Sequence, residues 1–311
     1  CDTIPPARAP WPAALTMTPL LQSPALLLLA VGTLLGLNFP LGKLAQAAQV
    51  PAVLWAALIS LGASSLLGAW LLLRRRPVVC DAQHLRYFVI TALVSYALPN
   101  LLVLAAMAHL GSGPTAMTFT LSPLFTALLS RLAGLRAPAR LEYWGIAIGF
   151  GGALLVALAR GEAGRPAAWL WVGVGLLIPL LLALGNVYRS LDWPPRADGT
   201  WLAVGSHGVA ALLLLALCAL TGAWRGLPAL AGVPWLAAAQ VAAAVLMFPL
   251  FFRLQALGGP VLLSQIGTVG AGVGVAVGAG LLGERYPPLV WGGVALIALG
   301  IGLTVWARRG T

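Results

Sequence analysis

Charged side chains are scarce in this sequence of 311 residues, where Asp, Glu, Lys and Arg together make up 8%. A soluble domain carries about 25%, so the composition excludes an ordinary soluble fold. Hydrophobic residues make up 60%. Because a helix needs about 20 apolar residues to cross a bilayer, the chain is predicted to be a polytopic membrane protein with no room for a separate extramembrane domain.

Acidic residues and cysteines are also few. Seven Asp and Glu stand against 18 Lys and Arg, which gives a net charge of +11. In a soluble protein this excess would suggest a nucleic-acid partner, but here the basic residues flank apolar segments, and we expect no nucleic acid. The three cysteines are widely spaced and match no metal-ligand pattern. We therefore expect no disulfide framework, no metal and no cofactor.

Long apolar segments predict an all-α fold of ten transmembrane helices. They cover residues 25–45, 53–73, 86–108, 114–134, 141–159, 167–189, 199–221, 233–256, 260–282 and 288–307. Turn-forming sequences such as Gly258-Gly259-Pro260 separate them. The preceding tail, residues 1–24, contains six prolines. We expect it to be disordered or partly non-native, with Met17 as a candidate natural start.

The basic residues also predict the orientation. If the N-terminus lies inside, most Lys and Arg fall on the cytoplasmic side of the ten predicted helices. Cytoplasmic connections are enriched in these residues. We therefore predict a multi-pass protein of a bacterial inner (plasma) membrane with both termini in the cytoplasm.

Parts of the chain repeat each other. Residues 110–114 (LGSGP) open one predicted helix and residues 257–260 (LGGP) open another, while Trp144-Gly145 and Trp291-Gly292 each begin a glycine-rich helix. The two predicted halves, each of five helices, cover residues 25–161 and 167–311. Because five is odd, the second half enters the membrane from the opposite side. In transporters such inverted repeats enclose a site near the midplane.

Three motifs carry a resemblance to a known family. They are Leu37-Asn38-Phe39-Pro40-Leu41-Gly42-Lys43, residues 121–129 (LSPLFTALL) and Gly283-Glu284. In this order the sequence resembles the drug/metabolite transporter superfamily, in particular its ten-helix EamA-like exporters of amino acids and aromatic metabolites. It departs from the family at Gly134-Leu135-Arg136, where Gly-Glu is expected, and near Ala57-Leu58, where an arginine is common. The resemblance implies a secondary transporter that moves small metabolites, usually outward, by alternating access.

The shortage of acidic residues bears on the solute. All seven carboxylates fall in tails, loops or predicted helix ends. A proton-coupled exporter of cations needs a buried acid that the proton and the cation share, because an isolated buried cation is costly. The sequence therefore favours a neutral or zwitterionic solute such as an amino acid. We expect a small-molecule substrate and membrane lipid as partners, in a chain that can act as a monomer.

Polar residues near prolines are the candidates for solute binding. Pro40, Pro99 and Pro123 each leave a backbone carbonyl without its usual donor, and irregular backbone at membrane depth is tolerated where protein or water covers it. The candidates are Asn38, Tyr96, Asn100, Ser122, Asn186 and Gln265. The alternative is that these side chains bond to their own backbone or hold neighbouring helices together.

Two cations near predicted helix ends are candidates for gating. Lys43 and Arg189 occupy related positions in an inverted pair and could form contacts across the two halves when one side closes, and Pro123 is a third gating candidate. Long cations at helix ends also extend, or snorkel, to the membrane interface, which is the alternative. His207 lies deep in a predicted helix, where it could relay protons or serve only in packing.

Other features leave two rival classes. An intramembrane serine hydrolase would use Ser64 with His207, but no GxSxG motif or orienting acid accompanies them. A channel would need a filter loop or a ring of charge, and neither is visible. Glycines at four-residue spacing in residues 32–36 and 270–278 predict close helix packing instead. We therefore predict a carrier and not an enzyme.

Overall fold

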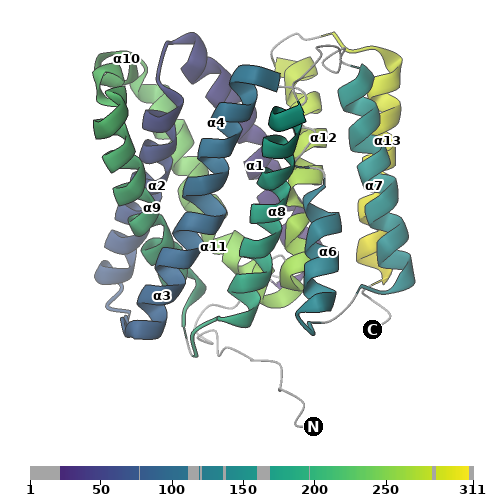
Figure 1. Ribbon diagram of the computed structural model, residues 1–311, viewed down its shortest axis with the longest axis horizontal. Coiled ribbons are helices and arrows are strands. Elements are labelled where there is room, and N and C mark those ends of the chain that lie inside the picture. The colour runs from purple at the N-terminus through teal and green to yellow at the C-terminus, as the bar shows by residue number, and fades with distance from the viewer. Residues whose placement is uncertain are drawn as a thin grey trace.

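The structure is a computed structural model that describes residues 22–76, 78–110, 119, 121–135, 138–159, 169–195, 197–281 and 285–307. The described residues form a bundle of helices that stand side by side and contain no strand (Figure 1). Seven helical segments among them are long and apolar enough to cross a membrane. The predicted all-α class is confirmed, and the seven segments fit a polytopic membrane protein.

The helices follow one another with short connections. The first half of the chain contains α1 (Pro24–Ala47), α2 (Ala52–Leu73), α3 (Ala82–Thr91), the π-helical segment η2 (Ala92–Ala97), α4 (Leu98–Leu110), α6 (Ser122–Leu132) and α7 (Arg140–Ala159). The second half contains α8 (Trp169–Leu191), α9 (Gly199–Thr221), the 3-10 segment η3 (Ala223–Gly226), α10 (Leu227–Ala231), α11 (Pro234–Ser264), α12 (Ile266–Leu281) and α13 (Pro288–Ala307).

Short polar residues define where several helices begin. The Ser23 side chain accepts a hydrogen bond from the backbone N–H of the third residue of α1. Asp81 accepts from the His84 N–H at 2.9 Å, and Asp198 accepts from the Thr200 N–H at 2.6 Å. Each cap satisfies a donor that has no partner within its helix. The caps of α3 and α9 therefore fix the start of two helices that contribute to the site described below.

A π-helical turn replaces one turn of the helix predicted over 86–108. The Leu98 N–H donates to the Leu93 carbonyl, five residues back, so η2 carries one extra residue in this turn. The irregular turn directly precedes Pro99, which has no N–H to donate. It also contains Ser95 and Tyr96, and the extra residue changes the direction in which their side chains point.

Proline marks the start of one further helix, and glycine interrupts another. α6 begins at Ser122 with Pro123 in its first turn, where a missing N–H leaves no helical bond unmade. The unbroken helix predicted over 114–134 is therefore wrong at this point, and part of that segment lies outside the described residues. α11 is interrupted at Gly259, whose φ of 69° is open to glycine without strain. This break confirms the turn predicted there.

Helix packing puts α11 at the centre of the bundle. α11 packs against α1, α2, α6, α8 and α9, while α2 packs against α9 and α7 against α13. α1 also contacts α12, and α8 also contacts α4 and α6. The largest apolar core lies around α11, with residues such as Phe252 and Leu254 fully buried. Side chains on the inward face of α11 are therefore shielded from lipid.

The connections before α3 and before α9 lie side by side at one end of the bundle. The Trp201 indole N–H in the first turn of α9 donates to the Val79 carbonyl at 2.7 Å, which joins the start of α9 to the connection before α3. In Figure 1 the start of α3 lies at the lower end of the view and α10 at the upper end. We call the end that contains Val79 and Trp201 the lower end.

Glycines allow the closest helix contacts. Gly152 of α7 meets Gly293 of α13, and Gly145 of α7 meets Gly300 of α13 about two helical turns away. The predicted glycine packing is also present between α1 and α12, where a Cβ on Gly36 would lie 2.9 Å from the Gly270 carbonyl oxygen. Small residues let helices in membranes approach closely enough for extensive van der Waals contact.

We predict that Gly293→Ala destabilises the protein. An added Cβ would lie 2.6 Å from the Gly152 carbonyl oxygen, so the backbones of α7 and α13 must separate. Overpacking of this kind costs about 1–3 kcal/mol, measured as the loss in free energy of unfolding in detergent. Gly292→Ala is the matched control, because a Cβ there meets no atom within 4 Å. Equal stability of the two variants would contradict the packing argument.

Candidate functional site

One face of α11 carries buried polar side chains at both ends of an aromatic stretch. Gln240, Met247, Phe248, Phe251 and Gln255 recur at helical spacing and are each at most 8% exposed. From Gln240 to Gln255 the face extends roughly 22 Å at 1.5 Å per residue. We call these five residues the α11 column. Side chains from α1, η2, α8 and α9 contact it.

An amide pair forms the upper end of the α11 column. The Gln240 Nε2 donates to the Asn38 Oδ1 of α1, and the Asn38 Nδ2 donates to the Leu34 carbonyl at 3.1 Å. The Asn38 Nδ2 also lies 4.0 Å from the Met247 sulfur. The Gln240 Oε1 is buried and has no partner among the described residues. A buried acceptor without a donor indicates a place where a bound molecule or water completes the bonding.

Aromatic rings occupy the middle of the column. The His207 ring lies 4.2 Å from the Tyr96 ring and 3.7 Å from the Phe248 ring, measured between centroids. The His207 Nδ1 is 3.4 Å from the Ser60 hydroxyl. The Tyr96 hydroxyl and the His207 Nε2 are buried without a partner in the described part of the chain. Two polar atoms with spare hydrogen-bonding capacity therefore lie beside aromatic faces.

A buried arginine lies at the lower end of the column. Arg189 of α8 is 1% exposed. Its Nη2 donates to Asn186 at 2.5 Å, its Nε donates to Gln255 at 3.4 Å, and its Nη1 donates to Ser95 of η2. The guanidinium carbon is 5.0 Å from the centre of the Phe251 ring, a cation–π distance. The snorkelling interpretation is therefore wrong for Arg189, because its charge is enclosed by protein.

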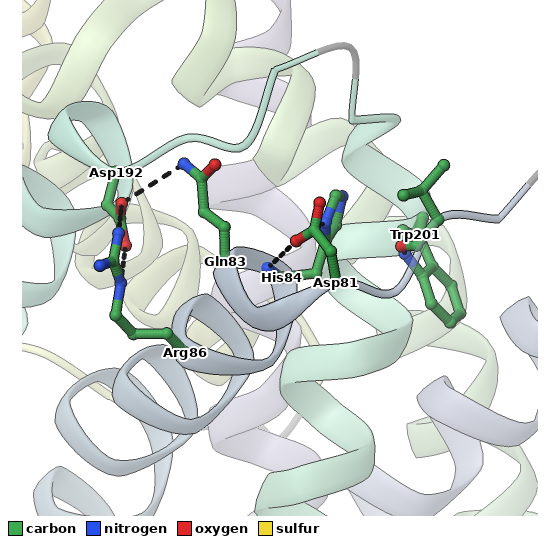
Figure 2. A network of polar contacts seen from close by, with 7 residues as sticks. Asp81, Gln83, His84, Arg86, Asp192 and Trp201 are labelled. Atoms are coloured by element: carbon green, nitrogen blue, oxygen red, sulfur yellow. Dashed lines mark hydrogen bonds and ion pairs between the residues drawn. The ribbon is translucent and has the colours of Figure 1, made fainter.

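Below Arg189, an ion pair joins the start of α3 to the end of α8 (Figure 2). Asp192 accepts from Arg86 through two nitrogens, with the Nε at 3.1 Å, and from the Tyr188 hydroxyl at 2.5 Å. The Gln83 amide lies at 3.5 Å from the same carboxylate. Burial raises the pKa of Asp192, but the bonds from Arg86 and Tyr188 outweigh burial and hold that pKa below its usual value.

A second carboxylate caps α3 beside this pair. Asp81 accepts from the His84 backbone N–H and lies 2.9 Å from the His84 Nδ1 (Figure 2). The backbone bond, followed by the side-chain bond, lowers the pKa of Asp81. The contact orders the start of α3, and so places Arg86 one turn further along the helix.

Two predicted residues lie away from the column. Pro123 and Gln265 line a cavity of about 10 Å³ with Thr268, between α6, α7, α12 and α13. The Gln265 Nε2 is buried and lacks a partner among the described residues. The cavity has room for about one water molecule, so it cannot hold a metabolite in this conformation. Ser122 precedes Pro123 and is buried.

The structure thus divides the sequence-predicted residues. Asn38 and Tyr96 contact the α11 column directly, and Asn186 and Arg189 join it at the lower end. Asn100 is half-buried on α4. The side chain of Lys43 lies outside the described residues.

Sequence reasoning did not find Ser95, Arg86 or Gln255 as site residues, and it placed Asp192 only in a connection. The contacts that define them join segments far apart in the chain, and no local motif marks them. A signal was available for Gln255. It follows Phe248 and Phe251 at spacings of seven and four, which places it on one helix face with them.

The geometry does not support a hydrolytic centre. The Ser64 hydroxyl donates to the Val204 carbonyl at 3.0 Å, and the serine near His207 is Ser60 instead. Within the described ranges no carboxylate contacts His207. Those residues also contain no group of three or more His, Cys, Asp or Glu side chains that could hold a metal ion. The chemistry of the column is therefore that of hydrogen bonding and ring contact.

Comparison with known proteins gives a consistent result. Residues 22–158 match the EamA-like transporter family. The chain is 26% identical over 260 residues to an inner membrane transporter of Escherichia coli K12, YedA, described as uncharacterized, and the match covers 83% of each chain. YedA of Escherichia coli O157:H7 matches with the same identity and coverage. A solved crystal structure has the same fold, with a TM-score of 0.70 and 18% identity over 93% of this chain and 100% of that chain.

We predict that Asp192→Asn lowers the free energy of unfolding at neutral pH by about 0.2–1 kcal/mol, since Arg86 is largely exposed and such pairs are weak. The pKa of Asp192 in the folded protein lies below its usual value of 3.8. The ion pair therefore stabilises the folded protein at pH values above 3.8, and this stabilisation is lost as the pH falls through the folded pKa. The difference between wild type and variant should stay constant from about pH 8 to about pH 5 and shrink below about pH 4. A difference that disappears already near pH 6 would contradict this assignment.

Proposed function

Residues 22–158 of this chain match the EamA-like transporter family, and from this match we propose that the protein is a secondary transporter that moves small neutral or zwitterionic metabolites outward across the inner membrane. The homologous YedA is an inner membrane transporter, which supports the location. The family match spans residues 37–43 and 121–129 and confirms the predicted resemblance to EamA-like transporters. Amino acids, including aromatic ones, are the proposed solutes.

The α11 column is the observation that carries this proposal. It is a buried row of amides and rings, with Asn38 bonded to one end and Arg189 to the other. The unpartnered Tyr96 hydroxyl, Gln240 Oε1 and His207 Nε2 give the row unused donors and acceptors. A ring-bearing zwitterion would use these groups together with the aromatic faces. Asn100, Ser122 and Gln265 are proposed to contact the solute in another conformation.

Packing supports the proposed count of ten helices in a 5+5 inverted repeat. In the proposed repeat, α1 corresponds to α8, α2 to α9 and α7 to α13. The segment α3–η2–α4 corresponds to α11 up to its break, and α6 corresponds to α12. The α2–α9 and α7–α13 pairs then map onto themselves. The contact between α1 and α12 corresponds to that between α8 and α6. The α1–α11 contact corresponds to the α8–α4 contact, and the α3–α9 contact to the α11–α2 contact. All six contacts in these three pairs are present. A two-fold relation between halves accounts for this pattern.

The lower-end contacts support alternating access. Arg86 and Ser95 belong to the first half, whereas Asp192 and Arg189 belong to the second. The Arg86–Asp192 and Ser95–Arg189 contacts therefore hold the two halves together at the lower end. We assign these contacts to closure of the cytoplasmic side, and they support the gating role predicted for Arg189. Lys43 is proposed to act at the opposite end of the bundle, and Pro123 at the start of α6.

The positions of the carboxylates support transport without an obligatory proton. The four carboxylates that the structure describes, those of Asp81, Glu142, Asp192 and Asp198, lie in a first turn or a connection. No acid in the described ranges lies beside the middle of the α11 column. A proton and a cationic solute therefore have no shared acid there.

A flux measurement tests the function. Full-length protein in proteoliposomes should take up radiolabelled amino acids from a panel with saturation, and without an imposed pH gradient. Tyr96→Phe should raise the half-saturating concentration about tenfold, or roughly 1.4 kcal/mol, while Tm stays unchanged because the hydroxyl has no partner among the described residues. Tyr87→Phe, which removes another unpartnered hydroxyl, is the control and should leave the flux unchanged.

Three results would contradict the proposal. Flux that rises linearly with solute concentration would indicate a channel. An absolute need for a pH gradient, removed by His207→Ala, would show that His207 relays protons. A lower Tm for Tyr96→Phe with unchanged half-saturation would make Tyr96 a packing residue.

Native Cys80 tests the orientation. It is exposed at the lower end of the bundle, and in intact cells we expect it to be shielded from a membrane-impermeant maleimide. A cysteine at Trp224, which is 54% exposed in η3, should react in a Cys80→Ser background. Permeabilised cells provide the control, since Cys80 should react there. Labelling of Cys80 but not of position 224 in intact cells would reverse the proposed topology.

A further inference from the structure

Arg189 carries a charge that its surroundings leave uncompensated. The guanidinium is enclosed, and its three hydrogen-bond acceptors are the neutral side chains of Asn186, Gln255 and Ser95. No carboxylate of the described residues lies within 4 Å of it, since Asp192, three residues along, pairs with Arg86. Removing a cation from water without an opposite charge costs several kcal/mol. This cost suggests that a negative group joins Arg189 in part of the working cycle.

The unused donors of Arg189 fit a carboxylate. A guanidinium has five N–H groups, and three donate within the protein. The remaining two lie on the terminal nitrogens, from which an arginine can hold both oxygens of a carboxylate. Ser95 belongs to the opposite half of the bundle, so separation of the halves would release one more donor. The closed contact and a bound carboxylate would then use the same guanidinium in turn.

The column favours one negative charge and does not select for an amine. Arg189 contacts Gln255 and Phe251 of the α11 column with a single positive charge, so a dianion such as a phosphate ester would leave one of its charges uncompensated by Arg189. No carboxylate in the described ranges contacts the column, so an ammonium group would meet only rings and neutral oxygens. Tyr96, Phe248 and Phe251 supply apolar surface beside the charge.

We propose that Arg189 binds the carboxylate of the transported solute, so that the protein selects monocarboxylates, which extends the solutes proposed above from zwitterions to monoanions that lack an amine. The proposal rests on the transport function proposed above and names the group by which the solute is selected. An acid should therefore be preferred to its amide of the same shape. Bidentate bonding to a charged partner accounts for a preference of about tenfold or more.

Matched acids and amides test the selection. The probes are L-phenylalanine and L-phenylalaninamide, L-threonine and L-threoninamide, and hydrocinnamate and hydrocinnamamide. Each is measured by radiolabelled counterflow in proteoliposomes and by the shift it causes in the Tm of purified protein. Wild type should prefer the acid to the amide at least about tenfold in at least one of the two aromatic pairs. The hydrocinnamate pair counts as an aromatic pair although it lacks an amine. Arg189→Gln should abolish the preference, and Arg189→Lys should retain part of it.

Arg253→Gln is the control, because it also removes a cation from the same end of the bundle but lies outside the column. It should keep the acid preference. Tm without a probe shows whether each variant folds, and Arg189→Lys keeps the test valid if Arg189→Gln does not fold.

Several outcomes overturn the proposal. Equal transport of acids and amides by wild type, or an acid preference that survives in Arg189→Gln, would limit Arg189 to closing the lower end while transport itself stands. The same conclusion follows if wild type moves only probes that lack a carboxylate. If no probe or panel solute is moved at all, the proposed function fails, and the carboxylate proposal fails with it.

Discussion

Water is absent from the hydrocarbon core of a membrane, so every polar group there needs a partner within the protein or in a bound molecule. This constraint accounts for the helices, which satisfy their own backbone, and for where they are irregular. η2 lies beside α8 and α9, where protein covers it. The same constraint makes each buried atom without a partner in the described part of the chain informative, and such atoms belong to Gln240 in the α11 column and to Tyr96 and His207 beside it.

Close packing creates the setting for that column. Glycine contacts draw α7 against α13 and α1 against α12, and Gly185 lets α8 approach η2 at Ser95. A side chain at position 185 would separate Ser95 from the Arg189 guanidinium. The glycine therefore contributes to the site although it has no functional group. Packing and recognition are connected through backbone distance.

The sequence predicts the helices better than it predicts the site. Apolar runs and turn residues locate the start of α9 at residue 199, but they place the start of α3 at residue 86, four residues after the helix begins behind its Asp81 cap. Asn38 and Tyr96 could be found as polar groups near prolines. Among the partners of Arg189, Asn186 was predicted, whereas Ser95 lies 94 positions away in an irregular turn that no local pattern marks. Asp192 pairs with a residue 106 positions away, a contact that only the tertiary fold creates.

The end of α8 links recognition to closure. Asn186, Arg189 and Asp192 recur every three residues and occupy successive turns near one face of the helix. Arg189 contacts Ser95 and Asp192 contacts Arg86, both in the first half of the chain, while Gln255 bonds Asn186 and Ser190 within the second half. α8 and α11 can therefore move as one body. If that body separates from η2 and α3, the polar contact and the ion pair break together, and the Arg189 guanidinium loses the Ser95 hydroxyl as an acceptor at the moment the lower end opens. A solute carboxylate that replaces Ser95 at that moment would make opening easier with solute than without it, because the ligand bonds more strongly to the open state than to the closed one. In this arrangement the same guanidinium selects the solute and favours the conformational change.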